Sequence, residues 1–278
     1  MTLLLNTIQP PLLTLLSSTS SPALSPLFVS YSDPSSSDTL ITVLNDSEHN
    51  ERSEEINRSN IVPRKFQQGF IIHPVIHIQS PNPRRAYIQA GCSTTSYSFC
   101  LRNGVKSQDC LPLGVALPCI GLQLRRLGQR DVSFEVGVVD SRKREGVIRC
   151  SSFKNKSAIY PHRLPPLICL PLTLPSSDSQ LTPWLEIPIN LASLLPLFQN
   201  LCRITDEEQE QDESRKRRRA QVELPSGEFE SVSYVRIYAN CRVRRIWFSA
   251  EGEQTFEGMG KGVKDEWALY AAEPRVST

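Results

Sequence analysis

The residue types best suited to chemistry in this sequence are basic ones. Residues 63–202 contain 16 lysine and arginine side chains against 7 acidic ones, a net charge of +9, although the whole chain has a formal net charge of only +2. Guanidinium and ammonium groups recognise carboxylates and phosphates, so this central segment predicts an acidic partner. The basic side chains that we expect to contact such a partner are Arg125, Arg126, Arg142, Lys143, Arg144, Arg242, Arg244 and Arg245.

A second basic cluster lies in the segment 203–228, between the acidic run DEEQEQDES and the sequence LPSGE. Its composition is typical of a nuclear localisation signal or a nucleic-acid patch, but the neighbouring acidic run can neutralise it within the chain. We therefore favour a solvated loop, with a nuclear address as the alternative. The cluster consists of Arg215, Lys216, Arg217, Arg218 and Arg219.

Motifs of catalysis and metal binding are missing from the sequence. It contains no G-x-S-x-G, no Walker A sequence and no H-E-x-x-H. His73 and His77 would share one face of a strand, but no cysteine or carboxylate stands near them to complete a metal site. The eight cysteines lack paired spacing and favour buried free thiols in a reducing compartment. We expect no catalytic residue, no cofactor, no metal and no small-molecule substrate.

The composition favours strands joined by turns. Proline outnumbers glycine by 21 to 13, which disfavours long helices, and no apolar run is long enough for membrane insertion. Residues 1–61 are rich in serine and proline and predict a disordered tail. We expect one β-sandwich domain over residues 62–272, with the charged loop 203–228 as an insertion and 273–278 as a second tail.

Particular segments support this all-β prediction. Residues 66–79 predict an outer strand, and residues 131–153 a hairpin whose loop carries Arg142 to Arg144. In that hairpin Val132, Phe134, Val136 and Val138 alternate with Ser133, Glu135 and Gly137, as in a half-buried antiparallel strand. The sequences LICLPLTL and WLEIPINL contain prolines that confine these strands to sheet edges or strand ends, and LASLLPLFQ predicts a short helix.

The stretch FESVSYVRIYANCRVRRIWFSAEGE predicts two further strands. Val235, Ile237 and Ala239 alternate with Tyr234, Arg236 and Tyr238 along the first of them. In the second strand the alternation slips at Arg244 and Arg245, which indicates a β-bulge that would aim one arginine out of the sheet.

Part of this stretch, YVRIYANCRVRRIWFS, closely resembles the signature of the cilia- and flagella-associated protein 20 family, a small group of axonemal proteins. The resemblance covers roughly residues 64–272. It implies a jelly-roll-like antiparallel β-sandwich with a short helix, similar in shape to carbohydrate-binding modules, and no catalysis. Its other segments are FQQGF at 66–70, LGVALPCIGLQLRRL at 113–127, VSFEVGVVD at 132–140, IRCSSF, LPLTL, the W-x-x-I-x-I-N-L pattern and EWALY at 266–270.

The resemblance implies a structural role in the cilium. Members of the family lie at the inner junction that links the A and B tubules of doublet microtubules, and they support motility. The implied partners are tubulin and neighbouring inner-junction proteins, and the implied location is the cytoskeleton of the axoneme. The region near residues 80–90 looks shorter than the family pattern, which puts individual partner contacts in question.

The alternative is a nuclear adaptor or nucleic-acid-binding relative that uses the cluster at 215–219. One exposed basic face would favour docking to an acidic lattice, whereas a groove flanked by aromatic side chains would favour single-stranded nucleic acid. Carbohydrate binding would require Trp184 or Trp247 to be exposed on a concave face, and core packing is the favoured role of both.

Overall fold

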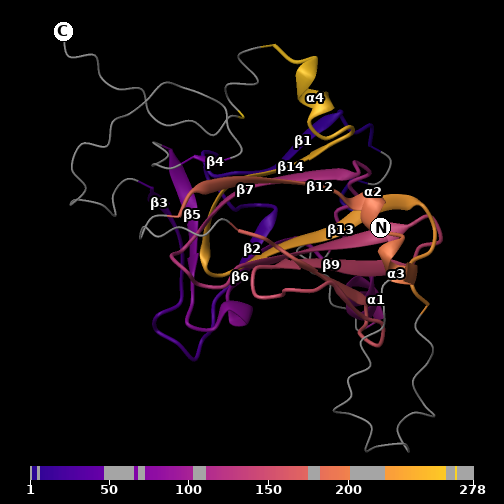
Figure 1. Cartoon of the computed structure of the whole chain (residues 1–278), viewed down its shortest axis with the longest axis horizontal. Coiled ribbons are helices and arrows are strands. Elements are labelled where there is room, and N and C mark those ends of the chain that lie inside the picture. The colour runs from indigo at the N-terminus through magenta and orange to yellow at the C-terminus, as the bar shows by residue number, and fades with distance from the viewer. Residues whose placement is uncertain are drawn as a thin grey trace, which may run out of the picture.

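The computed structural model describes residues 2–4, 7–46, 66–67, 73–102, 111–174, 182–200, 223–260 and 267. Two β-sheets lie one above the other (Figure 1). Sheet A contains β1 (Leu12–Ser17), β3 (Leu40–Asn45), β4 (Phe66–Gln67), β5 (Pro74–Gln79), β7 (Cys119–Arg126), β12 (Trp184–Asn190) and β14 (Cys241–Ser249). Sheet B contains β2 (Phe28–Tyr31), β6 (Tyr87–Gly91), β8 (Ser133–Asp140), β9 (Glu145–Ser151), β10 (Ala158–Tyr160), β11 (Leu167–Pro171) and β13 (Phe229–Tyr238).

The order of the strands confirms the predicted sandwich. Sheet A runs β3-β5-β14-β7-β12-β4, with β1 also paired to β14, and sheet B runs β10-β11-β9-β8-β13-β6-β2. Neighbouring strands are antiparallel except β9 and β11, which pair in parallel. Among the described residues, no helix combines the length and the apolar character needed to cross a membrane.

The core lies between the sheets and follows the alternation of each strand. Phe134, Val136 and Val138 of β8 are buried in it together with Val235 and Ile237 of β13, as the sequence predicts. Because successive side chains of a strand point to opposite faces, the residues between them lie on the outer face of sheet B. This parity places a row of polar and aromatic side chains on that face.

The prediction of a disordered tail over residues 1–61 is wrong for residues 7–46. Strand β1 pairs with β14, β2 with β6, and β3 with β5, so this segment contributes to both sheets. Leu16 and Phe28 are buried in the core. These short strands bury apolar side chains against strands that are distant in sequence. The free energy of that burial offsets the conformational entropy lost when a segment rich in serine and proline becomes ordered.

Other elements refine the sequence predictions. The hairpin of β8 and β9 is confirmed, but β8 is buried along its whole length and not half-buried. Residues 66–79, predicted as one outer strand, contain two strands: β4 lies at an edge of sheet A, whereas β3 covers β5. Strand β12 is close to an edge, since β4 pairs with it only at Trp184 and Leu185. The β-bulge is also confirmed, because the register between β14 and β7 shifts between Val243 and Arg245.

The predicted helix at residues 191–199 forms as two single turns at one end of the sandwich (Figure 1). These are α2 (Leu191–Leu194) and α3 (Leu197–Asn200), and Pro196, which lacks an N–H group, lies between them. Asn190 caps α2 by accepting a 3.2 Å hydrogen bond from the Ser193 N–H group. Two further helices, α1 (Thr94–Arg102) and α4 (Gln254–Glu257), were not predicted from the sequence.

Candidate functional site

Four of the arginines predicted to contact a partner are buried on sheet A. Arg125, Arg242, Arg244 and Arg245 are each 6% exposed or less. The eight predicted residues therefore do not form one exposed basic face, and these four guanidinium groups are not available to a partner in this structure.

Asp46 directly follows β3, and its carboxylate forms ion pairs with two of these buried arginines. It accepts a 3.0 Å hydrogen bond from Arg125 Nη1 and a 2.9 Å bond from Trp184 Nε1, and it forms an ion pair with Arg242. Burial lowers the pKa of Arg125, and the Asp46 carboxylate opposes that shift. His77 joins the same network, with its Nδ1 atom 3.3 Å from Arg242 Nε. The network stabilises the fold and ties the N-terminal segment to sheet A.

The other two buried arginines flank the bulge. Arg244 Nη1 lies 3.5 Å from Gln123 Oε1, and the Arg245 guanidinium lies over the Trp267 ring at 4.4 Å from its centroid. Trp184 and Trp247 are only 1% and 4% exposed, so neither presents the open ring that carbohydrate binding would require.

The remaining predicted contacts lie at two turns. Arg126 is half-buried and donates to the backbone carbonyls of Gln129 and Arg130. At the tip of the β8–β9 hairpin, Lys143 pairs with Glu230, and Arg144 Nη2 lies 2.7 Å from Glu223. Intramolecular carboxylates thus partly neutralise the tip.

Arg142 is exposed there and lies 3.3 Å from Ser226 Oγ through its Nη1 atom. The cluster Arg215 to Arg219 lies outside the described residues, and nothing found here supports the nuclear location that it suggested.

Asp140 organises this hairpin tip, and we expect its removal to destabilise the protein in a pH-dependent way. Its carboxylate accepts hydrogen bonds of 2.8–2.9 Å from the N–H groups of Arg142, Arg144, Ser226 and Gly227. Burial alone would raise the pKa of Asp140, but these four donors outweigh burial and lower it. Stability from this group is therefore present above the ordinary aspartate pKa and is lost as the pH falls through the lowered value.

Asp140→Asn should lower the free energy of unfolding by roughly 2–4 kcal/mol at neutral pH, and by less at about pH 2. Urea unfolding at several pH values measures this difference, with the exposed Asp131→Asn as the matched control. A loss that did not change with pH would contradict this role of the charge.

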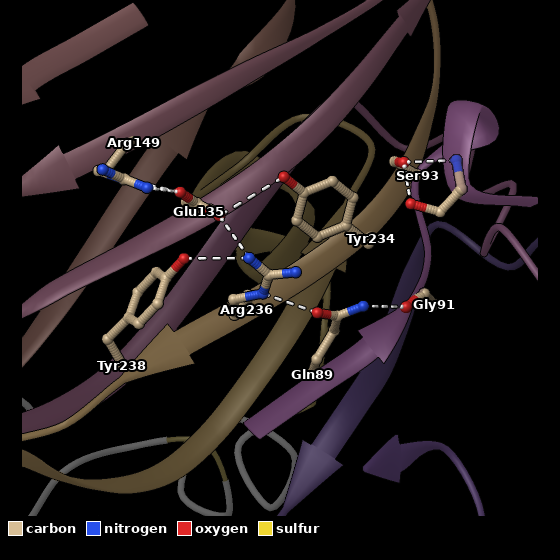
Figure 2. Close-up of polar contacts among 9 residues, drawn as sticks. Gln89, Gly91, Ser93, Glu135, Arg149, Tyr234, Arg236 and Tyr238 are labelled. Atoms are coloured by element: carbon tan, nitrogen blue, oxygen red, sulfur yellow. Dashed lines mark hydrogen bonds and ion pairs between the residues drawn. The ribbon is translucent and has the colours of Figure 1, made fainter. Parts of the chain in front are cut away.

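The outer face of sheet B carries the best candidate site. Strand pairing aligns Gln89 of β6, Arg236 of β13, Glu135 of β8 and Arg149 of β9 in one row across the sheet. Figure 2 shows this row from above, with Tyr234 and Tyr238 on either side of Arg236.

Glu135 is the centre of the row. Its Oε1 atom accepts a 2.7 Å hydrogen bond from Arg149 Nε, and its Oε2 atom lies 3.3 Å from Arg236 Nη1 and 3.5 Å from the Tyr234 hydroxyl. Arg236 also donates to Gln89 Oε1 at 2.6 Å and to the Tyr238 hydroxyl at 3.1 Å. The result is two arginines held in fixed positions around one buried carboxylate.

The two guanidinium groups of this row, on Arg149 and Arg236, stay charged despite their partial burial. Burial alone would lower the pKa of Arg149, but Glu135 outweighs it and the pKa is raised. The pKa of Arg236 is raised in the same way, mainly by Tyr238 and Glu135. Burial and the adjacent Glu135 raise the pKa of Tyr234, so that hydroxyl stays protonated and can donate.

A cavity of 340 Å³ opens over this row. The half-buried Arg149 and Arg236 and the exposed Arg163 line it, and we call it the arginine cavity. Its volume falls in the range of protein ligand sites, about 300–1,000 Å³. The other lining residues are Gln89, Ser93, Ser96, Glu135, Val147, Leu164, Pro165, Leu167 and Tyr234.

Part of this site can be predicted from the alternation of side chains along two strands. The alternation in β8 and β13 already assigned Glu135, Tyr234, Arg236 and Tyr238 to the faces opposite the core. What it lacked was the pairing of β8 with β13 and β9, which brings these residues together. Arg163 lies in the loop between β10 and β11, where no strand alternation could assign its side chain to a face of the sheet.

The family profile of the CFA20 domain matches residues 37–201, more than half of the chain. The match begins within the segment whose composition predicts a disordered tail, and it includes Glu135, Arg149 and Arg163. A search of curated proteins found no matching relative. The chain therefore belongs to the CFA20 domain family, a family of cilia- and flagella-associated proteins.

Proposed function

We propose that this protein is a structural component of the axoneme that associates with microtubules. In the finer form of the proposal, it takes part in the inner junction that links the A and B tubules of the doublet and supports ciliary motility. The family match carries the proposal, because it assigns the chain to a cilium-associated family. Tubulin and neighbouring inner-junction proteins are the proposed partners.

The distribution of charge supports a microtubule surface as the partner. Arg163 is exposed at the arginine cavity, and Arg142 and Lys143 are exposed at the hairpin tip. Four arginines of sheet A are buried instead, namely Arg125, Arg242, Arg244 and Arg245. Cationic groups on the outside of sheet B would be attracted to an acidic lattice.

We also propose that the protein is not an enzyme. In the arginine cavity the one carboxylate among the described residues, Glu135, forms ion pairs with Arg149 and Arg236. Glu135 is 3% exposed and is engaged by donors on both oxygens, an arrangement suited to fixing arginines rather than to proton transfer.

Co-sedimentation of the full chain with stabilised microtubules tests the proposal. We expect the protein to pellet with microtubules at about 50 mM salt and several-fold less at about 300 mM, because salt screens exposed charges. Microtubules whose acidic tails have been removed by protease should pellet less of it. Failure to pellet at every salt concentration, and also with inner-junction proteins added, would contradict microtubule association.

A further inference from the structure

We propose that the arginine cavity binds a glutamate- or aspartate-rich segment of a protein partner, with an incoming carboxylate held between Arg149, Arg163 and Arg236. The inference deepens the proposed function and rests on it for the source of that acidic segment.

The cavity presents donors that the protein does not use. Arg149 donates from Nε and Nη2 to Glu135. Arg236 donates from Nε to Gln89 and from Nη1 to Glu135 and Tyr238. Within the described part of the chain, Nη1 of Arg149 and Nη2 of Arg236 have no hydrogen-bond acceptor. Figure 2 shows how Glu135, Gln89 and Tyr238 engage the two guanidinium groups. An added carboxylate can therefore bind without breaking the existing network.

Glu135 holds the guanidinium groups of Arg149 and Arg236 in place by hydrogen bonds. Because it fixes both guanidinium planes before any partner arrives, little side-chain entropy is lost on binding. Arg149 and Arg236 side chains are 17% and 27% exposed, so they combine partial burial with access from solvent. A carboxylate bound there is shielded from water more than at an open surface, which strengthens charge-assisted hydrogen bonds.

Arg163 supplies the third positive charge at the rim. It is exposed, lies over the Tyr160 ring at 5.7 Å from its centroid, and has no ion pair among the described residues. Lys154 is close by, with its Nζ atom 3.4 Å from the Tyr160 hydroxyl. Burial raises the pKa of the Cys169 thiol, and the charges of Arg149, Lys154 and Arg163 all oppose that shift. These three cations therefore lie near the Cys169 thiol, and Cys169 pairs in register with Arg149.

An acidic polypeptide fits this cavity better than nucleic acid does. Three arginines and one carboxylate converge on a single cavity, whereas a nucleic acid strand needs a line of cations and open aromatic faces for its bases. The rings of Tyr234 and Tyr238 are 5% and 6% exposed, so neither offers a face for stacking. Arginine clusters are a recurrent way to recognise acidic motifs in proteins.

The test is the binding of a fluorescein-labelled decaglutamate peptide to the full chain, followed by fluorescence anisotropy at low salt. We expect saturable binding that decaglutamine does not show. Arg163→Glu should weaken binding at least tenfold, since it reverses an exposed charge without touching the Glu135 network. Arg130→Glu is the matched control, because Arg130 is also exposed but does not line the cavity. Thermal unfolding confirms that both variants are folded.

Equal binding by the Arg163→Glu variant and the wild type would overturn the inference, as would the absence of any decaglutamate binding. Stronger binding of oligothymidylate than of decaglutamate would overturn the choice of an acidic polypeptide.

Microtubule association and acidic-peptide binding by the arginine cavity can be refuted independently of each other. If the protein pellets with microtubules but does not bind decaglutamate, only the proposed role of the arginine cavity is refuted. If it binds decaglutamate through Arg163 but never pellets, only microtubule association is refuted.

Discussion

Replacing Asp46 with asparagine is expected to lower the free energy of unfolding by about 3–5 kcal/mol, because breaking a buried ion pair leaves uncompensated charge. Asp46 is fully buried, and Arg125 and Arg242, which it pairs with, are 4% and 6% exposed. The asparagine keeps the shape of the side chain but removes the negative charge that both guanidinium groups face. Trp184 would also lose a charged acceptor for its indole N–H group.

Urea unfolding of the full chain measures this effect. The exposed Asp38→Asn is the matched control, since it removes a carboxylate from the same segment and should change stability by less than about 0.5 kcal/mol. A similar small effect of Asp46→Asn would show that the Asp46 network contributes little to stability.

Removal of residues 1–61 is expected to abolish cooperative unfolding. The truncated chain would lack β1, β2 and β3, and with them the strands that cover part of β14, one side of β6 and one side of β5. It would also lack Asp46. Uncovered strand edges and core side chains favour aggregation over a folded sandwich.

The truncation needs a point variant beside it, because a deletion changes many contacts at once. Leu16 is 2% exposed and packs in the core, so Leu16→Ala in the full chain should cost about 2–5 kcal/mol. Thermal unfolding followed by circular dichroism measures both proteins. A truncated chain that unfolded cooperatively near the wild-type temperature would show that the N-terminal strands are dispensable.

Local patterns predicted the parts of this fold that depend on neighbours in sequence. The alternation in β8 and β13 identified the core residues Phe134 and Ile237, and the parity slip located the bulge at Arg244. Each of these signals needs only the period of a strand and the preference of apolar side chains for the interior.

Long-range pairing explains what the sequence did not reveal. Arg242 reads as a solvated cation, but its partner Asp46 stands 196 residues away, in a segment whose composition suggests disorder. The same applies to the arginine cavity, where Arg236 meets Glu135 across 101 residues. A buried arginine cannot be told from an exposed one until its carboxylate is found, so only the pairing of strands could separate the arginines of sheet A from those of sheet B.

Zero-length carbodiimide cross-linking of the full chain on microtubules tests most directly whether the outer face of sheet B meets the acidic lattice. The reagent joins a lysine amine to a carboxylate in contact with it, and mass spectrometry identifies the linked residues. The account predicts a link from Lys154, beside the arginine cavity, to glutamates of the tubulin tails, and loss of that link in the Arg163→Glu variant. Tubulin links from Lys143 at the hairpin tip, with none from Lys154, would contradict it.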